Sequence, residues 1–284
     1  MKDEQLLRYS RQIMLPEMDV AGQQRLVDAT VLIVGMGGLG CPVAMYLAAA
    51  GIGHLIISDH DTVELTNLQR QIAHSQENLG DSKVGSVEET LKGLNPDVQI
   101  TSIKKRLLNE ELDRAVNQAD AVVDASDNFT TRFDINRSCI KSAKPLISGA
   151  AIRMEGQVAV FDSRNADSPC YQCLYQEEKD DVLSCANNGV MAPLVGIIGS
   201  MQAMETIKVL SGIGTSLAGR LLLLDATNMN GEKCTCRGTL NVGHVARIKA
   251  IIAISYPNHT FQNLYLPAIM RALIKSSQLV VLEL

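Results

Sequence analysis

One glycine-rich turn constrains this chain more than any other feature. Residues 35–40 read Gly-Met-Gly-Gly-Leu-Gly, directly after the apolar run 31–34 and directly before the helix-forming stretch 41–50. A G-x-G-x-x-G turn between a strand and a helix lets backbone N–H groups and the helix N-terminus face a phosphate. Asp59 closes the next apolar run, at the spacing expected for a ribose contact. The pattern predicts a nucleotide site containing Gly35, Gly37, Gly38, Gly40 and Asp59. The alternative is a turn that serves only helix packing.

The rest of the first 230 residues alternates between short apolar runs and helical stretches. Strands are expected at 55–58, 98–103, 121–124, 145–148, 157–161 and 220–225, and helices at 82–94, 109–117, 131–142 and 193–210. This alternation predicts an α/β fold, a Rossmann-like, mostly parallel sheet with helices on both faces. We expect a helical N-terminal arm at 1–28 and one domain at 29–230, with a cysteine-bearing loop at 170–189. Ligands of such sheets bind at the carboxyl ends of the strands.

Composition excludes several classes of protein. The chain has 284 residues and a formal net charge of -5, which argues against a general nucleic-acid binder. The N-terminus is charged and lacks an apolar signal region, and the most apolar stretch, 43–57, is too short to span a bilayer. We therefore expect a cytoplasmic protein with no membrane and no nucleic-acid partner. The seven cysteines include one C-x-x-C, which favours metal or thiol chemistry in a reducing compartment.

Polar residues that follow the expected strands indicate which nucleotide binds. The glycine turn alone would favour an NAD- or FAD-binding oxidoreductase. Asn67, Arg70 and Lys83, however, follow the second strand, where a dinucleotide fold needs only a ribose acceptor. Such donors suit a triphosphate better, because they neutralise charge on phosphate oxygens and on leaving pyrophosphate. Asp127, after the strand at 121–124, could hold Mg²⁺, which prefers one or two carboxylates plus phosphate oxygens. Taken singly, each could be an ordinary surface residue.

Together these residues resemble the MoeB/ThiF (E1-like) family. The resemblance rests on motifs spread over about residues 5–228: Arg8–Ile13, the turn at 35–40, 58–61, 67–71, Lys83, Asp127-Asn128, Cys170–Cys173, 189–194 and 202–205. It implies ATP-dependent adenylation of the C-terminal carboxylate of a ubiquitin-like sulfur-carrier protein that ends in Gly-Gly. The segment 149–157 looks more like the molybdopterin branch of the family than the thiamine branch. The thiamine-pathway carrier remains an alternative, as does a non-catalytic carrier-binding scaffold.

The resemblance also assigns roles to residues. Asp59 would hold the ribose, Gly38 would lie against the nucleotide, Asn67, Arg70 and Lys83 would contact phosphates, and Asp127 would serve magnesium. The implied nucleotide-binding set also contains Thr66, Leu68, Gln69 and Asn128. Arg11 would reach the ATP of the neighbouring subunit, which implies a homodimer with composite sites. Cys185 matches the candidate thiol of the family for a thioester or persulfide link.

Zinc binding depends on the C-terminal part of the chain. Cys170 and Cys173 are half of a structural zinc site, for which four ligands are expected. The family supplies a second C-x-x-C near its C-terminus, whereas this chain has Cys234-Thr235-Cys236. Whether the chain binds zinc is therefore left open by the sequence. From about residue 231 the resemblance stops, and 231–284 is expected to be an atypical tail.

The atypical tail has a specific explanation. Residues 231–245, back-translated with permitted codons and read from one nucleotide upstream, can spell Trp-Arg-Lys-Met-His-Leu-Pro-Arg-Asn-Pro-Glu-Cys-Arg-Ser-Cys. That reading restores a C-x-x-C. We therefore hypothesise a frameshift near codon 231; the alternative is a lineage-specific extension.

Overall fold

The computed structural model describes residues 1–165, 168–175 and 189–236. Cys185 and residues 237–284 of the predicted tail lie outside this part of the chain. Within it, no helix combines the length and the apolar character that crossing a membrane would need.

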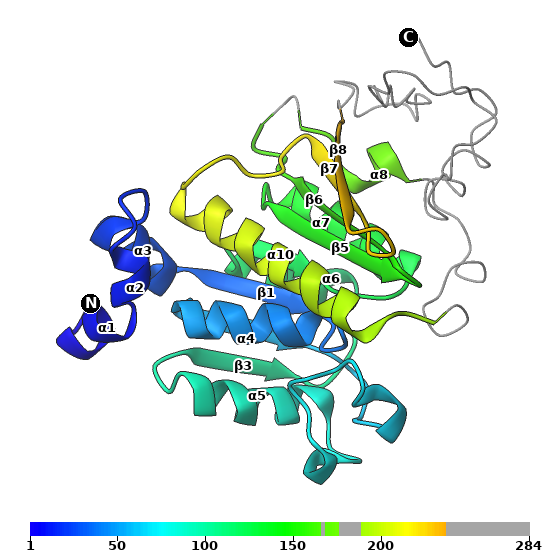
Figure 1. Cartoon of the computed structure of the whole chain (residues 1–284), viewed down its shortest axis with the longest axis horizontal. Coiled ribbons are helices and arrows are strands. Elements are labelled where there is room, and N and C mark those ends of the chain that lie inside the picture. The colour runs from blue at the N-terminus through cyan, green and yellow to red at the C-terminus, as the bar shows by residue number, and fades with distance from the viewer. Residues whose placement is uncertain (166–167, 176–188, 237–284) are drawn as a thin grey trace.

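An eight-stranded mixed sheet forms the centre of the molecule (Figure 1), in the order β3-β2-β1-β4-β5-β6-β7-β8. The first five strands of that order pair in parallel, and β6, β7 and β8 continue the sheet in antiparallel pairing. The strands are β1 (Thr30–Val34), β2 (His54–Ser58), β3 (Gln99–Ile103), β4 (Ala121–Asp124), β5 (Leu146–Ile152), β6 (Glu155–Phe161), β7 (Arg220–Asp225) and β8 (Asn230–Thr235). The parallel half has the strand order of a dinucleotide-binding sheet.

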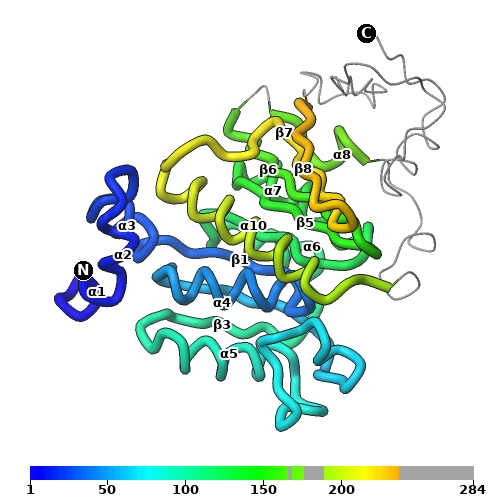
Figure 2. The backbone as a smooth tube through the Cα atoms, in the orientation of Figure 1, coloured from blue at the N-terminus to red at the C-terminus, as the bar shows by residue number. Residues whose placement is uncertain are grey.

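Helices cover both faces of the sheet. Figure 2 shows α4 (Gly40–Ala50), α5 (Lys83–Leu94) and α10 (Ala192–Ser211) on the near face. The other face carries α6 (Asn109–Gln118), α7 (Phe129–Lys141) and the single turn α8 (Tyr171–Leu174). Two short 3₁₀ turns, Leu65–Asn67 and Gln76–Asn78, lie between β2 and α5. The predicted Rossmann-like fold with helices on both faces is confirmed.

Alternation along the strands divides the core into two apolar layers. In β1, Val31 and Ile33 belong to the layer under α4, α5 and α10, whereas Leu32 and Val34 belong to the layer that α6 and α7 cover. Neighbouring strand residues point to opposite faces, so a strand buried on both sides reads as a continuous apolar run. This is why the runs in the sequence identified the central strands.

The N-terminal arm consists of α1 (Asp3–Arg8), α2 (Ser10–Ile13) and α3 (Asp19–Asp28). It lies at the end of the sheet where β1 begins (Figure 1). The Arg25 guanidinium donates to the Ser211 carbonyl at 2.8 Å, which ties α3 to the end of α10. The buried Tyr9 hydroxyl accepts from the Asn95 amide at 2.9 Å, which ties the arm to the end of α5.

Strand β8 lies across the predicted domain limit at residue 230. It pairs antiparallel with β7, with Asn230 opposite Asp225 and Thr235 opposite Arg220. Cys234 belongs to the apolar layer that α6 and α7 cover. The sequence contains no apolar run at this place, so no strand was expected there. The first residues of the predicted tail therefore extend the sheet.

Candidate functional site

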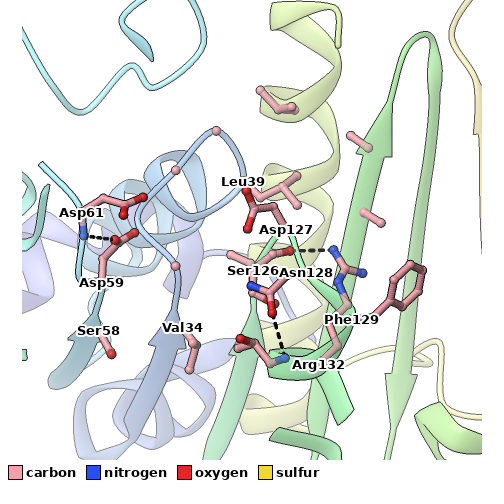
Figure 3. Close-up of a pocket in the computed structure, with 18 of the residues that line it drawn as sticks. Val34, Leu39, Ser58, Asp59, Asp61, Ser126, Asp127, Asn128, Phe129 and Arg132 are labelled. Carbon is pink, nitrogen blue, oxygen red and sulfur yellow. Dashed lines mark hydrogen bonds between the residues drawn. The ribbon is translucent and has the colours of Figure 1, made fainter. Parts of the chain in front are cut away.

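A pocket opens at the carboxyl ends of β1, β2 and β4 (Figure 3). Its lining comes from the glycine turn, from the segments that follow β2, β3 and β4, and from the start of α5 and of α7. On one side it extends past β5 and β6 to Tyr171 and Tyr175. Strands that run in parallel bring their carboxyl ends to one edge, which is why these segments meet although they are far apart in sequence.

The glycine turn is shaped by close backbone contacts. Gly35 has φ +96°, a left-handed conformation that side chains disfavour, and its N–H donates to the Ser58 carbonyl at 2.8 Å. A Cβ added to Gly40 would lie 1.8 Å from the Gly35 carbonyl oxygen. At Gly37 the nearest atom to an added Cβ would be the Gln71 side-chain nitrogen, at 3.5 Å. Gly40 is therefore needed for packing, whereas Gly37 lines the pocket without being crowded.

Asp59 follows β2 and braces the turn. One carboxylate oxygen accepts from the Met36 N–H at 2.7 Å, and the other accepts from the Asp61 N–H at 2.8 Å. Figure 3 shows Asp59 and Asp127 on opposite sides of the turn. The carboxylate predicted to hold a ribose is thus fixed by two backbone donors at the pocket edge.

Two predicted cations line the pocket with Asp59. Lys83 is the first residue of α5 and is 6% exposed, yet its ammonium pairs with the Asp61 carboxylate at 2.9 Å. Burial alone would raise the pKa of Asp61, but the hydrogen bond and charge of Lys83 outweigh it and hold that pKa below its usual value. Arg70 donates to the Thr66 carbonyl at 3.1 Å. Of these two predicted cations, Lys83 is therefore paired with an acidic side chain, and Arg70 is hydrogen-bonded to the backbone of its own loop.

Asp127 and Asn128 follow β4. Asp127 is an exposed pocket-lining residue, and its carboxylate is the kind of oxygen ligand that Mg²⁺ takes beside phosphate oxygens, so it fits that metal. The Asn128 side-chain oxygen accepts from the Thr131 N–H at 2.9 Å and so caps α7. The same oxygen accepts from the Arg106 guanidinium at 2.8 Å. Asn128 thus also orients a second arginine at the pocket.

The described cysteines do not assemble a four-ligand site. The Cys170 and Cys173 sulfur atoms lie 3.4 Å apart, and hydrogen bonding from Cys173 lowers the pKa of Cys170 to about 6. Cys234 and Cys236 are buried, and burial raises the pKa of both thiols, that of Cys236 to about 11. Within the described ranges, the one group of three or more metal-ligating side chains is Asp59, His60 and Asp61. The C-x-C segment therefore does not complete the zinc site that Cys170 and Cys173 begin.

Several predicted residues lie away from the pocket lining. Gly40 begins α4 behind the turn. The exposed loop that includes the 3₁₀ turn Leu65–Asn67 carries four others: Thr66, Asn67, Leu68 and Gln69, of which none is among the lining residues. Arg11 is exposed on α2, at the opposite end of β1 from the pocket. Cys185 falls outside the described residues.

Sequence reasoning missed two arginines that line the pocket. Arg106 comes three residues after the end of β3, so the rule that ligands gather at strand ends could have found it. Arg132 is buried in the first turn of α7, and its guanidinium donates to the Ser126 carbonyl at 2.6 Å (Figure 3). Nothing in the local sequence distinguishes Arg132 from an ordinary helix residue.

Comparison with known proteins agrees with this geometry. The ThiF family model matches residues 9–241. The chain is 46% identical over 226 residues to the molybdopterin-synthase adenylyltransferase of Escherichia coli, covering 80% of this chain and 90% of that protein. It is 44% identical over 237 residues to the E. coli sulfur carrier protein ThiS adenylyltransferase, covering 84% and 94%.

Solved structures share the fold. PaaA superposes with a TM-score of 0.73 at 24% identity, covering 84% of this chain and 76% of that one. E. coli MccB, in a crystal structure with ATP, superposes with a TM-score of 0.70 at 23% identity, covering 82% and 72%.

Proposed function

The chain belongs to the ThiF family and is an adenylyltransferase, and from this premise we propose that it activates the C-terminal glycine of a ubiquitin-like sulfur carrier. ATP is the nucleotide donor. The carrier would end in Gly-Gly and serve molybdopterin biosynthesis. A thiamine-pathway carrier is the second candidate, because the identity to the ThiS adenylyltransferase, 44%, is close to the 46% of the molybdopterin enzyme.

The reaction needs positioning and charge neutralisation more than covalent help from the protein. A carrier carboxylate oxygen attacks the α-phosphorus, the bond to the β-phosphate oxygen breaks, and acyl-adenylate and pyrophosphate result. In our proposal Asp59 holds the ribose, and the turn amides face the phosphates. Lys83 and Arg70 neutralise charge on the phosphate oxygens and the leaving group. Mg²⁺, when bound through Asp127, would further neutralise the triphosphate.

The pairing of Lys83 with Asp61 adds a step to this scheme. A nearly buried ammonium without a partner would be costly, and Asp61 supplies that partner while its own side chain is half exposed. In our proposal the incoming triphosphate takes over the ammonium, and Asp61 turns toward solvent. Asp61 would thus keep Lys83 charged and correctly placed before ATP arrives.

The proposal includes a homodimer in which Arg11 acts on the partner's nucleotide. Arg11 is exposed and far from the pocket of its own chain, as such a role requires. The arm around it also exposes apolar side chains: Leu7 is 78% exposed and Met14 71%. Cys185 would act only after adenylation, in a thioester or persulfide link with the carrier. A cytoplasmic location goes with these assignments.

The shared site can be tested by complementation. Arg11→Ala and Lys83→Ala chains, each inactive alone, are co-expressed so that mixed dimers form. If Arg11 acts in the partner's site, each mixed dimer has one intact site, and random pairing restores roughly a quarter of wild-type activity. Activity that stays absent in purified mixed dimers would remove Arg11 from the proposal.

The observation that supports the function most is the common location of Asp59, Arg70, Lys83 and Asp127 around one glycine turn. The decisive experiment is ATP–pyrophosphate exchange with purified carriers. We expect exchange that depends on the carrier and disappears when its terminal glycine is deleted. Tight NAD(H) binding with hydride transfer would replace the proposal with an oxidoreductase. Carrier binding without exchange would indicate a scaffold.

A further inference from the structure

The glycine turn is held through the backbone of one buried residue, Met36. Its N–H donates to Asp59 at 2.7 Å, and its carbonyl oxygen lies 3.1 Å from the His74 Nε2 atom. Met36 is fully buried and His74 is 7% exposed. The Cys41 thiol also reaches this carbonyl, at 3.5 Å, but a thiol is a weak donor. His74 is therefore the main donor to a carbonyl in the middle of the turn.

The hydrogen bonds determine which nitrogen of His74 carries the proton. A carbonyl oxygen can only accept, so Nε2 must carry a hydrogen. Nδ1 lies 2.9 Å from the Ser86 hydroxyl, which can donate to it. Burial is the largest influence on His74 and lowers its pKa, which favours the neutral ring. The neutral Nε2–H tautomer satisfies the Met36 carbonyl and the Ser86 hydroxyl, and the Cys41 sulfur, 3.8 Å from Nε2, is at most a weak further partner.

This contact also joins the turn to the helix that carries Lys83. Ser86 lies in the first turn of α5, three residues after Lys83. On the same helix the Thr90 hydroxyl donates to the Ala73 carbonyl at 2.7 Å. The segment at 73–74 is thus bound to α5 at two points and to the turn at one.

We propose that His74 is a positioning residue for the nucleotide: it holds the Met36 carbonyl so that the amides of Gly37 and Gly38 stay directed into the pocket, in register with Lys83. The alternative is that His74 is an ordinary core residue whose ring only fills space beside α5. The two differ in what a donor at the Nε2 position contributes. The nucleotide part of the inference rests on the proposed function, whereas the shape of the turn does not.

Three substitutions separate the donor from the volume. His74→Gln keeps an N–H donor at nearly the same reach as Nε2, and His74→Phe keeps the ring but loses the donor. Thr90→Val is the matched control, because it removes a bond from the same segment to α5 without touching Met36. Should the Phe variant not fold, His74→Asn, whose amide is one methylene shorter, takes its place.

The first measurement is hydrogen–deuterium exchange of the peptide that spans residues 35–41, without any ligand. We expect exchange about tenfold faster in His74→Phe, the scale of losing one buried hydrogen bond, and near wild type in His74→Gln and Thr90→Val. Equal exchange in the Phe and Gln variants would overturn the inference, since the donor would then not matter.

The second measurement is the dissociation constant of Mg-ATP. We expect it to rise about tenfold in His74→Phe and less than threefold in His74→Gln, at unchanged carrier KM. A Phe variant that melts at a lower temperature but binds ATP as wild type would show a purely structural role. If the wild type itself bound no ATP, the proposed function would fail, while the exchange experiment would still decide whether His74 holds the turn.

Discussion

Two substitutions in the glycine turn can separate its role in packing the fold from its role in binding the nucleotide. Gly37→Ala and Gly40→Ala add the same methyl group three residues apart in one turn. At Gly40 the added Cβ would lie 1.8 Å from the Gly35 carbonyl oxygen, so backbone must move by more than 1 Å. At Gly37 the nearest atom is 3.5 Å away, which is ordinary contact, and φ is not positive there.

The two variants should therefore fail in different ways. We expect Gly40→Ala to lower the free energy of unfolding by about 3 kcal/mol from overpacking, less about 1 kcal/mol that alanine returns in a helix. That net loss corresponds to a melting temperature lower by roughly 4–8 °C for a chain of this size. Gly37→Ala should melt within about 1–2 °C of wild type, because surface substitutions away from special features change stability by only a few tenths of a kcal/mol. It should nevertheless bind Mg-ATP more than about tenfold more weakly, because its methyl group enters the space where phosphate oxygens would approach the amides.

Differential scanning calorimetry and equilibrium ATP binding on the same preparations measure both quantities. Gly93→Ala is the control, since an added Cβ there meets nothing within 4 Å. A Gly37→Ala protein that is fully folded and binds ATP as tightly as wild type would refute the assignment of this turn to phosphate. A Gly40→Ala protein as stable as wild type would refute the packing argument.

Three further changes have expected outcomes. Asp61→Asn should lower the free energy of unfolding at neutral pH by about 0.5–1 kcal/mol, discounted because the carboxylate is half exposed. Since Lys83 holds the pKa of Asp61 below its usual value, the wild type has this stabilisation in full above pH 4 or so and loses it as pH falls through the lowered pKa. The difference between the two proteins should thus shrink in melts at successively lower pH and vanish once the pH lies below that lowered pKa. Asn128→Ala should cost about 1 kcal/mol through loss of the α7 cap. It should also raise the KM for ATP, because Arg106 keeps only its second partner, the Thr131 hydroxyl; an unchanged KM would show that Asn128 is not needed to place Arg106. Elemental analysis of the purified chain should find far less than one zinc per chain, and a chelator should leave its melting temperature unchanged; stoichiometric zinc would show that Cys170 and Cys173 find further ligands that the described cysteines do not supply.

The parts of the site that sequence predicted are those fixed by local rules. Gly35 and Gly40 are dictated by one tight turn, and Asp59 by its place at the end of the next parallel strand. Lys83 was expected near phosphate, and it does line the pocket. What the local pattern could not supply is the pairing of side chains across the fold. That Asp61 holds Lys83, or that Asn128 holds Arg106, depends on where separate loops meet.

In the fold, too, local patterns were predictable from the sequence and long-range pairing was not. Central strands buried on both faces read as apolar runs and were predicted to within a few residues. Strand β8 was not predicted because edge strands expose most of their side chains and so show no apolar run. In β8 only Cys234 is buried, and Asn230–Lys233 are all exposed. Its existence follows from pairing with β7, a long-range contact that hydrophobic periodicity does not report.

The burial pattern of β8 bears on the frameshift hypothesis. The sheet buries positions 234 and 236 and exposes 232 and 233. The alternative reading would put methionine at 234 and leucine at 236, with arginine and lysine at 232 and 233. Larger apolar side chains would then occupy the buried positions and charged ones the exposed positions, as an edge strand over an apolar layer requires.

The gene's nucleotide sequence tests the hypothesis directly. We expect codons 231–245 to permit the shifted reading, so that one inserted or deleted base near codon 231 separates the two frames. A chain made with the shifted frame should bind one zinc through Cys170, Cys173 and the restored C-x-x-C, and should melt at a higher temperature because a metal that binds only the folded state stabilises it. Codons that place stops or other residues in that frame would end the hypothesis and leave a lineage-specific extension.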